Sequence, residues 1–379
     1  MNFELNKKQK LFRQMIREFA EKEVKPIAAE VDEKEMFPVE NVKKMAKLGI
    51  FGIPIPVEYG GAGGDNIMYS IAVEELSRVC GTTGVIVSAH TSLCVAPIYE
   101  MGSEEQKKRF LPKLCSGEWI GAFGLTEPNA GTDASSQQTV AVDDGDEYVL
   151  NGTKIFITNA GYAHVYIVFA MTDKSQGVKG ISTFIVEKDT PGFSIGKKEL
   201  KMGIRGSATS ELIFENCRIP KSNLLGKIGG GFSIAMKTLD GGRIGIAAQA
   251  LGLAQGALDE TIKYTTERKQ FGRSISKFQN TQFQMADLHT KTEASRLLVR
   301  AAAFKKDSGV SYSADAAMAK LFASETAMEV TTKAVQFHGG YGYTREYPVE
   351  RMMRDAKITE IYEGTSEVQR MVIAAKIFK

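Results

Sequence analysis

Cysteine and histidine are scarce in this sequence, and the few that occur are scattered. Four cysteines stand in 379 residues without a CxxC pair, which is too few for a disulfide framework in a chain of this length. The four histidines lie far apart and include no HExxH-like pair, so the spacing typical of metal ligands is absent. We therefore expect a reducing compartment and no metal site.

The sequence also lacks a surface charge of one sign. It contains 48 Lys and Arg against 45 Asp and Glu, and the two signs alternate along stretches such as RQMIREFAEKEVK at 13–25. Such mixing is typical of solvated helix faces, whereas nucleic-acid binders show a basic stripe with interleaved aromatic residues. We expect no nucleic-acid partner.

No continuous apolar run approaches the length of a membrane-spanning helix. The N-terminal stretch MNFELNKKQKLFRQMIREF contains acidic residues and no apolar core, unlike a signal or transit peptide. Hydrophobic residues make up 43% and charged residues 25%, values near the averages of globular proteins. The sequence predicts a cytoplasmic protein without membrane contact, large enough for two or three domains.

The hydrophobic pattern divides the chain into three regions. Residues 1–118 follow a helical period, with Phe12, Met15, Ile16 and Phe19 forming one core-facing stripe. Residues 119–228 consist of short β-type runs such as TKIFIT and VYIVFAM, which predict an antiparallel β domain. Residues 229–379 return to a helical period and predict a bundle of long helices. The fold class is therefore α+β and mostly α.

Glycine-rich segments mark turns in this pattern. Asn151-Gly152 separates two β-type runs and predicts a type I′ hairpin turn, because both residues tolerate a positive φ. The run GGAGG at 60–64 has no preceding strand and the chain has no GxGxxG, so a loop is favoured over a phosphate-binding turn. The order helical, β, helical does not match a doubly wound nucleotide-binding fold.

Four segments rich in Gly, Thr and Asn interrupt the regular pattern. Glycine allows the main chain to approach a ligand closely, and Thr and Asn offer small hydrogen-bond donors. The composition therefore predicts ligand contact in FGLTEPNAGTDAS from Phe123, KIFITNAG from Lys154, QFHGGYGYTREYP from Gln336 and RDAKITEIYEGTSEVQR from Arg354.

Glu363 stands out in the last of these segments. It follows two apolar residues and precedes Gly364, Thr365 and Ser366, so it projects from a loop at the start of a helix. The spacing fits a carboxylate that interacts with the helix N-terminus at least as well as it fits a catalytic group. The pattern alone does not decide between them.

These segments in this order resemble the acyl-CoA dehydrogenase family over essentially the whole chain. The similar motifs are LTEPNAGTD, ITN, ERKQFGR, QFHGGYGYTREYPVERMMRDAKI and IYEGTSEVQR. The stretch GGRIGIAAQALGLAQGAL and the absence of terminal extensions look most like short-chain, butyryl-CoA dehydrogenases of clostridial type. The resemblance implies an N-terminal helical domain at 1–118, a middle β domain at 119–228 and a C-terminal four-helix bundle at 229–379.

The resemblance also implies FAD, bound between the β domain and the C-terminal helices. Residues expected at the flavin ring are Phe123, Leu125, Thr126, Phe156, Ile157 and Thr158, with Thr132 at the cofactor or at CoA. Residues expected at the diphosphate and adenosine end, reaching from a neighbouring subunit in part, are Arg268, Phe271, Gln279, Gln336, Gly339 and Gly340. Thr365 and Glu367 are expected to border the cofactor, and Phe156 stands where the family often has Trp.

For the substrate, the resemblance implies that Asp240 and Arg243 meet CoA, with an Asp240–Arg243 ion pair as an equal alternative, and that Tyr362 and Gly364 flank the thioester. Glu363 matches the family base, which removes the α-proton while the β-hydrogen leaves as hydride. Gly242 occupies the position that carries the base in some relatives and cannot act as one.

The expected activity is α,β-dehydrogenation of butyryl-CoA, or its reverse, with an electron-transfer flavoprotein as electron partner and a homotetramer, a dimer of dimers, as the assembly. The stretch SAHTSLCVAPI from Ser88 is expected at the floor of the acyl cavity. Other readings stay open: another short or branched acyl-CoA, an acyl-CoA oxidase, or a non-catalytic subunit that docks the flavoprotein. The end of the chain soon after IYEGT favours the dehydrogenase, because the oxidases carry a further helical domain.

Overall fold

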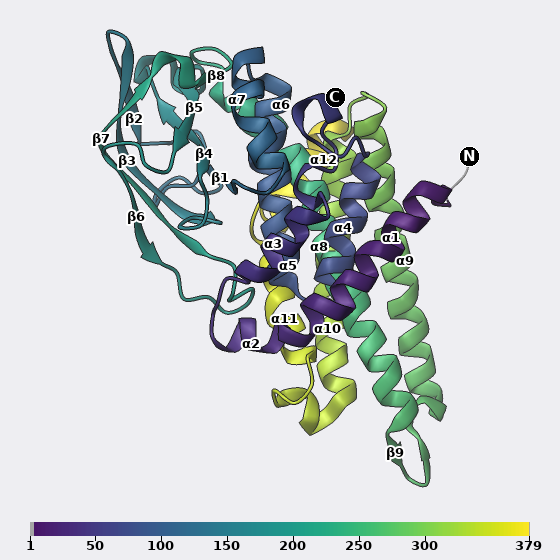
Figure 1. Ribbon diagram of the computed structural model, residues 1–379. Helices are drawn as coiled ribbons and strands as arrows, with labels where there is room; N and C mark the ends of the chain where they lie inside the picture. Colours follow the sequence, from purple (N-terminus) through teal and green to yellow (C-terminus); the bar gives the residue numbers. More distant parts are fainter. Residues whose placement is uncertain (1–3, 379) are drawn as a thin grey trace.

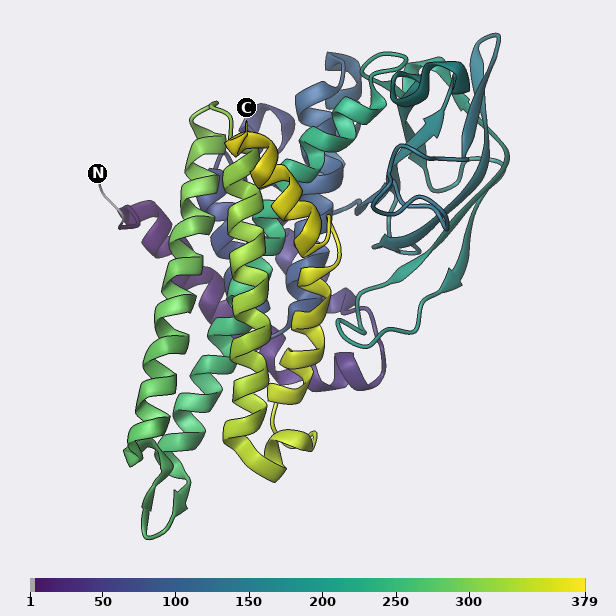
Figure 2. The same ribbon diagram turned by 180° about the vertical axis from the view of Figure 1, so that it is seen from behind.

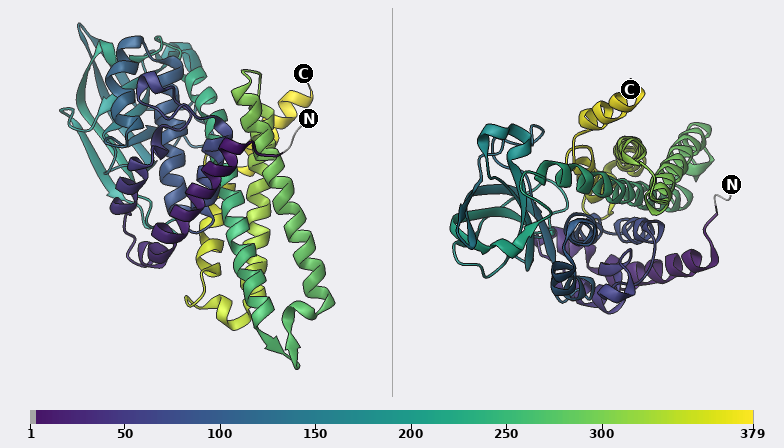
Figure 3. Two further views of the ribbon diagram at one scale, coloured as in Figure 1. Left: turned by 45° about the vertical axis from the view of Figure 1, so that its right-hand side comes forward. Right: turned by 90° about the horizontal axis from the view of Figure 1, so that it is seen from above.

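Helices and an eight-stranded sheet occupy separate parts of the molecule (Figure 1). The computed structural model describes residues 4–378. The sheet lies at one side of the helical body in both views of Figure 3. The N-terminal helices are α1 (Lys7–Phe19), α2 (Ala28–Glu33), α3 (Val39–Lys47), α4 (Asn66–Ser77), α5 (Gly81–Ser88), α6 (Ala96–Met101) and α7 (Glu104–Cys115).

Helix α1 shows how the predicted stripe is used. Asn6 and Gln9 form a capping box that satisfies the first backbone donors of the helix. Ile16 is fully buried, and Phe12 and Phe19 pack against the core. Met15 remains 37% exposed, so it lies at the edge of the stripe and not in the core.

The prediction that no apolar run reaches membrane-spanning length is wrong. Helix α5, the π-helical turn η5 (Ala89–Val95) and α6 form a continuous helical stretch, Gly81–Met101, that is long and apolar enough to span a bilayer. The reason for its apolar composition is different, because its apolar window is buried inside the protein and the stretch reaches the surface only near its end, at Glu100. It is a core helix that packs on the sheet side against β1 and on the bundle side against α8.

The sheet contains β1 (Gly121–Gly124), β2 (Val140–Asp144), β3 (Glu147–Thr158), β4 (Val165–Met171), β5 (Ile181–Glu187), β6 (Phe193–Lys198), β7 (Thr209–Pro220) and β8 (Leu224–Leu225). Its strand order is β6-β7-β3-β2-β4-β5-β8, with β1 beside β4. The expectation of an antiparallel sheet needs correction, because β1 and β2 both pair with β4 in parallel. The sheet is mixed, and these parallel pairs join strands that are distant in sequence.

The predicted hairpin turn at Asn151-Gly152 is also wrong. Both residues lie inside β3, where the pairing with β7 shifts register between Leu150 and Gly152. Gly152 is required there because a Cβ would come within 2.5 Å of the hydroxyl of Thr139, the residue just before β2. The β2–β3 turn lies earlier, at Gly145. An Asn-Gly pair that looks like a turn is therefore a β-bulge between neighbouring strands.

The C-terminal region is built on three long helices, α8 (Gly231–Glu267), α9 (Gln279–Asp307) and α10 (Ser313–His338). The short hairpin of β9 (Lys269–Gln270) and β10 (Arg273–Ser274) joins α8 to α9. The fourth position beside α10 is filled by two shorter helices in line, α11 (Val349–Lys357) and α12 (Ser366–Ile377), as Figure 2 shows. The connections between α7 and β1 and between β8 and α8 contain the domain boundaries predicted at 118/119 and 228/229.

Candidate active site

A cavity of about 280 Å³ lies where the sheet, the core helix and the C-terminal bundle meet. Its β-domain wall comes from β1, the loop after it and the end of β3, and its opposite wall comes from α8 and the segment between α11 and α12. The predicted site residues that line it are Phe123, Leu125, Thr126, Thr132, Phe156, Ile157, Thr158, Arg243, Tyr362, Glu363 and Gly364. Four distant segments of the sequence therefore converge on one cavity.

Glu363 lies in the break between α11 and α12. Its φ is +53° and that of Gly364 is +92°, values that no continuous helix allows. Thr365 caps α12, because its hydroxyl accepts a hydrogen bond from the Val368 N–H. The interpretation of Glu363 as the carboxylate at this helix start is therefore wrong, since Thr365 fills that position. The carboxyl group of Glu363 lines the cavity instead.

The carboxyl group of Glu363 fits into a space that Gly242 leaves open on α8. A Cβ at Gly242 would lie 2.0 Å from Oε2 of Glu363, and 2.8 Å from Leu93 on the core helix. Oε2 is shielded from solvent and has no hydrogen-bond partner among the described residues. Burial raises the pKa of Glu363 to about 8, against the opposing charges of Lys320 and Arg243. The site thus holds an unpaired carboxyl group whose pKa lies near neutral pH.

The turn that carries Glu363 is fixed from both sides. The Gly364 carbonyl accepts hydrogen bonds from Nζ of Lys320 and from Nε2 of Gln369, each at 2.7 Å. The Tyr362 hydroxyl donates to Oε1 of Gln249 on α8. These contacts hold the residues before and after Glu363, while Oε2 of its carboxyl group has no hydrogen-bond partner within residues 4–378.

Arg243 and Asp240 form the ion pair that was one of the two sequence expectations. Nη1 of Arg243 lies 2.5 Å from Oδ1 of Asp240, which also accepts a hydrogen bond from Ser313 at 2.9 Å. Arg243 lines the cavity and its Nε has no partner among the described residues, whereas Asp240 does not reach the cavity wall. Asp240 therefore holds the Arg243 side chain through the ion pair without lining the cavity itself.

The loop after β1 is held by a buried ion pair that the sequence did not reveal. Lys154, fully buried on β3, donates to Glu127 at 2.7 Å, to the Leu125 carbonyl at 3.1 Å and to Gln137 at 3.1 Å. Glu127 in turn accepts from the backbone N–H of residues 138 and 139. This network fixes the backbone on both sides of Thr126, whose carbonyl accepts from the Ile155 N–H at 2.9 Å.

The remaining predicted residues do not reach this cavity. Arg268, Gly339 and Gly340 line a separate cavity of about 520 Å³ at the other end of α8 and α10. The β9–β10 hairpin at that end carries Phe271, which is 92% exposed, and points away from the sheet in Figure 1. Gln279 and Gln336 are exposed at the adjoining ends of α9 and α10, and Glu367 is exposed in the first turn of α12.

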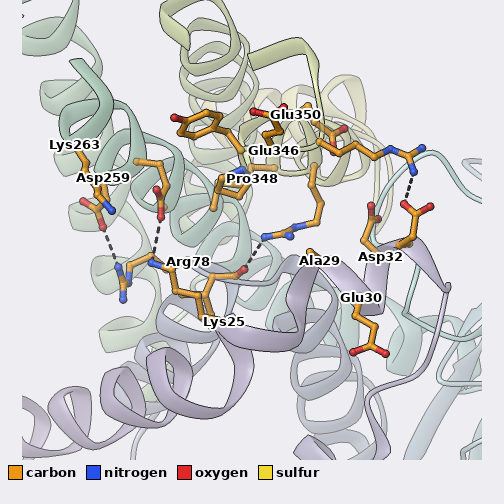
Figure 4. A pocket seen from close by; sticks show the side chains of 18 residues that line it. Lys25, Ala29, Glu30, Asp32, Arg78, Asp259, Lys263, Glu346, Pro348 and Glu350 are labelled. Carbon is orange, nitrogen blue, oxygen red and sulfur yellow. Dashed lines mark hydrogen bonds and ion pairs between the residues drawn. The ribbon is translucent and has the colours of Figure 1, made fainter. Parts of the chain in front are cut away.

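A third cavity, of about 750 Å³, lies between α2, α8 and α11, away from Glu363 (Figure 4). Its charged side chains are largely paired with one another. Arg78 contacts Asp259 at 3.1 Å, and Lys25 contacts Glu260 at 3.2 Å. Although it is larger, none of the predicted site residues is among the described residues that line it.

The chain matches the acyl-CoA dehydrogenase N-terminal, middle and C-terminal domain models over residues 6–118, 122–217 and 229–378. It is 65% identical to a short-chain specific acyl-CoA dehydrogenase of Clostridium acetobutylicum over 379 residues, covering 100% of both chains. The chain belongs to the acyl-CoA dehydrogenase family. The recognition of this family from its motifs, and the α+β fold expected from it, are confirmed.

Two solved structures superpose on this acyl-CoA dehydrogenase over 100% of both chains with a TM-score of 0.99. One is butyryl-CoA dehydrogenase from Megasphaera elsdenii, at 52% identity. The other comes from work on the electron transferring flavoprotein of Acidaminococcus fermentans, at 58% identity. Enzymes of the family are flavoproteins that use FAD.

The residues of this acyl-CoA dehydrogenase fit such a cofactor and an acyl thioester. Phe156 is held at a φ of +58° with 59% of its surface exposed at the cavity, which leaves an aromatic face open. Thr126 and Thr158 line the same wall and offer hydroxyl groups. The unpaired Oε2 of Glu363 and Nε of Arg243 lie on the opposite wall.

We predict that replacing Lys154 with Met destabilises the enzyme by about 3–5 kcal/mol, because the Glu127 carboxylate stays buried without its partner. Denaturant unfolding of both proteins measures this difference. Lys154→Met combined with Glu127→Gln is the matched control and should recover part of the loss. A loss below about 1 kcal/mol in the single variant would contradict the role of the pair.

We predict that Glu363→Gln gains stability relative to the parent as pH rises from 4.5 to about 8. The folded pKa of Glu363 exceeds its unfolded value, so its contribution is fully present below 4.5 and is lost as pH approaches 8. Glutamine does not titrate, and the gain is at most about 1.4 kcal/mol per pH unit.

Thermal unfolding midpoints of the two proteins across this pH range, at equal FAD content, measure the effect. Glu58→Gln, at an exposed position, is the control for the amide substitution itself. A difference in midpoint that stays constant with pH would show that Glu363 has no raised pKa.

Proposed function

We propose that this enzyme catalyses the α,β-dehydrogenation of short-chain acyl-CoA thioesters, butyryl-CoA to crotonyl-CoA or the reverse, with Glu363 as the base. The carrying observation is the unpaired carboxyl group of Glu363, which faces the β-domain wall across one cavity and fills the space above Gly242. High similarity to a short-chain specific relative over the full length supports the substrate class.

Glu363 performs the proton transfer in this proposal. A thioester α-proton is weakly acidic, so a base whose pKa lies close to the working pH is the most effective one. The site provides this, because burial raises the pKa of Glu363 to about 8 before any substrate adds to its desolvation. The unpaired Oε2 is the acceptor atom, and the carboxyl must lose its own proton before it acts.

The thioester carbonyl must be polarised while the α-proton leaves. We assign the backbone N–H of Glu363 as the protein donor, with Tyr362 and Gly364 flanking the thioester. The hydrogen bonds to the Gly364 carbonyl and the Tyr362 hydroxyl hold this turn, so the donor and the base keep a fixed relation. FAD, when bound, accepts the β-hydrogen together with its electron pair.

The opposite wall is assigned to the flavin ring. Phe123, Leu125, Thr126, Phe156, Ile157 and Thr158 line it, and the Lys154–Glu127 network fixes the loop that carries Thr126. Thr132 and Arg243 are assigned to CoA, with Asp240 acting through its ion pair with Arg243. Thr365 and Glu367 are proposed to border the cofactor.

The acyl chain is assigned to the apolar end of the cavity. Val85, Ala89 and Leu93 from the core helix line it, and the last two lie within the stretch expected at its floor. Because these side chains are packed in a core helix, the cavity cannot deepen easily, which supports a short chain over a long one. Another short or branched acyl group is the competing substrate.

The adenosine end of FAD is assigned to the second cavity in a neighbouring subunit. Arg268, Phe271, Gln279, Gln336, Gly339 and Gly340 gather at the far end of the bundle, away from Glu363. An Arg there suits a diphosphate, because a guanidinium pairs with phosphate oxygens in a bidentate manner. This separation supports a homotetramer arranged as a dimer of dimers.

Electron-transfer flavoprotein is proposed as the electron partner. The support is the solved structure from work on the electron transferring flavoprotein of Acidaminococcus fermentans, in which a 58% identical chain matches over its full length. A cytoplasmic location is proposed as well, since all four cysteines are buried and unpaired, as in a reducing compartment.

We predict that anaerobic mixing of the yellow protein with acyl-CoAs of increasing length bleaches the flavin band fastest at four carbons. Glu363→Gln should keep FAD and fold while slowing this bleaching by at least about 100-fold, the usual contribution of a general base. Stopped-flow absorbance measures both. Bleaching of the variant at the parental rate would refute the base, and an optimum at a branched acyl-CoA would refute the substrate alone.

We predict that Arg268→Ala weakens FAD retention, because one phosphate contact from the neighbouring subunit is lost. The ratio of flavin to protein absorbance after gel filtration measures retention, and the elution volume reports the assembly. Lys269→Ala, which removes the next positive charge on the same exposed hairpin, is the matched control. Equal FAD content in Arg268→Ala and its control would remove Arg268 from the site.

A further inference from the structure

A lysine lies behind the turn that carries the proposed base. Lys320 belongs to α10, is fully buried, and donates Nζ to the Gly364 carbonyl at 2.7 Å. Lysine is almost never fully buried unless its charge is compensated. Among the described residues Lys320 forms no salt bridge within 4.0 Å, and the opposite charge with the largest effect on it is Glu363. A costly buried cation thus contacts the backbone of the turn that carries Glu363.

The turn itself requires an anchor. Glu363 has a φ of +53°, which is unfavourable for a residue with a side chain and persists only when its surroundings enforce it. Two groups hold the next carbonyl, Lys320 from α10 and Gln369 from α12. The two bonds have the same length and the same acceptor, but only one donor carries a charge. Gln369 is therefore a natural control for Lys320: its loss removes a hydrogen bond that positions the turn, whereas the loss of Lys320 removes a hydrogen bond and a positive charge.

We propose that Lys320 is a positioning residue of this active site: its hydrogen bond holds the Glu363–Gly364 turn, and its charge sets the proton affinity of the Glu363 carboxyl group. This inference rests on the proposed role of Glu363. A positive charge close to a carboxyl group favours its ionised form, so Lys320 keeps the base deprotonated at a lower pH than burial alone allows.

The other charged and titratable groups around Glu363 do not replace Lys320. Arg243 faces it from α8 and is already paired with Asp240 at 2.5 Å. Tyr69 from α4 and the neighbouring Tyr362 are buried phenols whose pKa values are raised, first by burial, so both remain neutral.

Two carboxylates, Glu360 and Glu367, act on Lys320 more weakly than Glu363 does. Burial lowers the pKa of Lys320 to about 8, with Glu363 opposing that shift, so the lysine is still charged at neutral pH. Lys320 is thus the one cation near Glu363, within residues 4–378, whose charge no contact ion pair neutralises.

The test compares Lys320→Met, Lys320→Arg and Gln369→Met in the FAD-loaded enzyme. Infrared difference spectroscopy, with the protonated carboxyl band assigned by its absence in Glu363→Gln, follows the titration of Glu363 without substrate. The pH dependence of flavin reduction by butyryl-CoA follows the same group during the reaction. FAD content and thermal midpoint check that each variant is folded.

We expect Lys320→Met to move the midpoint of both titrations upward by about one pH unit, because the charge that favours the carboxylate is lost. Gln369→Met should slow flavin reduction at every pH and leave the midpoint in place, since it removes only an uncharged anchor. Lys320→Arg keeps the charge, so its midpoint should stay near that of the parent even if the altered hydrogen bond lowers the rate.

An unshifted midpoint of the Glu363 titration in folded Lys320→Met overturns the proposal. An equal shift in Gln369→Met also overturns it, because the position of the turn would then explain the shift without any effect of the lysine charge. If Lys320→Met does not fold, a Lys320→Arg midpoint that moves upward by a unit overturns it in the same way. Failure of the proposed function is a different result, because Glu363→Gln would then reduce flavin as fast as the parent.

Discussion

The candidate active site depends on the placement of one carboxyl group, that of Glu363, with an oxygen shielded from solvent. Shielding Oε2 of Glu363 without a hydrogen-bond partner among residues 4–378 is costly, and burial raises the pKa of Glu363 to about 8. Three features of the helical bundle accommodate this carboxyl group. The fourth helix of the bundle is broken at a positive φ to bring the carboxyl inward, α8 has a glycine where the side chain enters, and α10 supplies a buried lysine. The positive φ and the buried lysine are unfavourable by themselves, and the glycine is an ordinary residue of a helix. All three are explained by the position of the Glu363 carboxyl group.

The parts of the fold that sequence could predict are those governed by local periodicity. The helical pattern around 285–304 corresponds to α9, and the glycines at 229–231 precede and begin α8. The errors arose where distant strands decide the outcome. Asn151-Gly152 has the composition of a turn, but Gly152 allows the close approach of Thr139, which immediately precedes the neighbouring strand β2. The parallel pairing of β1 with β4 likewise leaves no mark in either strand, since register is set by tertiary contacts.

The site divides in the same way. Motifs that resembled a known family located the lining of the Glu363 cavity, because those segments are irregular and stand out from the helical and β-type pattern. Lys154 and Lys320 were missed because each lies inside a strand or helix, where a lysine is normally predicted to face solvent. Their partners lie far along the chain: Lys154 contacts the loop after β1 and Gln137, and Lys320 contacts the turn at Gly364. The one local hint was for Lys154, which falls at an inward-facing position of β3 together with Tyr148 and Leu150.

The two sets of residues that were predicted to bind FAD lie in separate cavities. Glu363 and the proposed flavin wall lie at one end of the bundle, whereas Arg268 and the exposed Phe271 lie at the other, on a hairpin that no element of the same chain covers in Figures 1 and 2. The long straight helices α8 and α10 keep these ends apart, and their buried alanine-rich and glycine-rich contact leaves little room for bending. In the proposed assembly the two sets of residues bind FAD from different subunits, so subunit assembly would contribute to holding the cofactor.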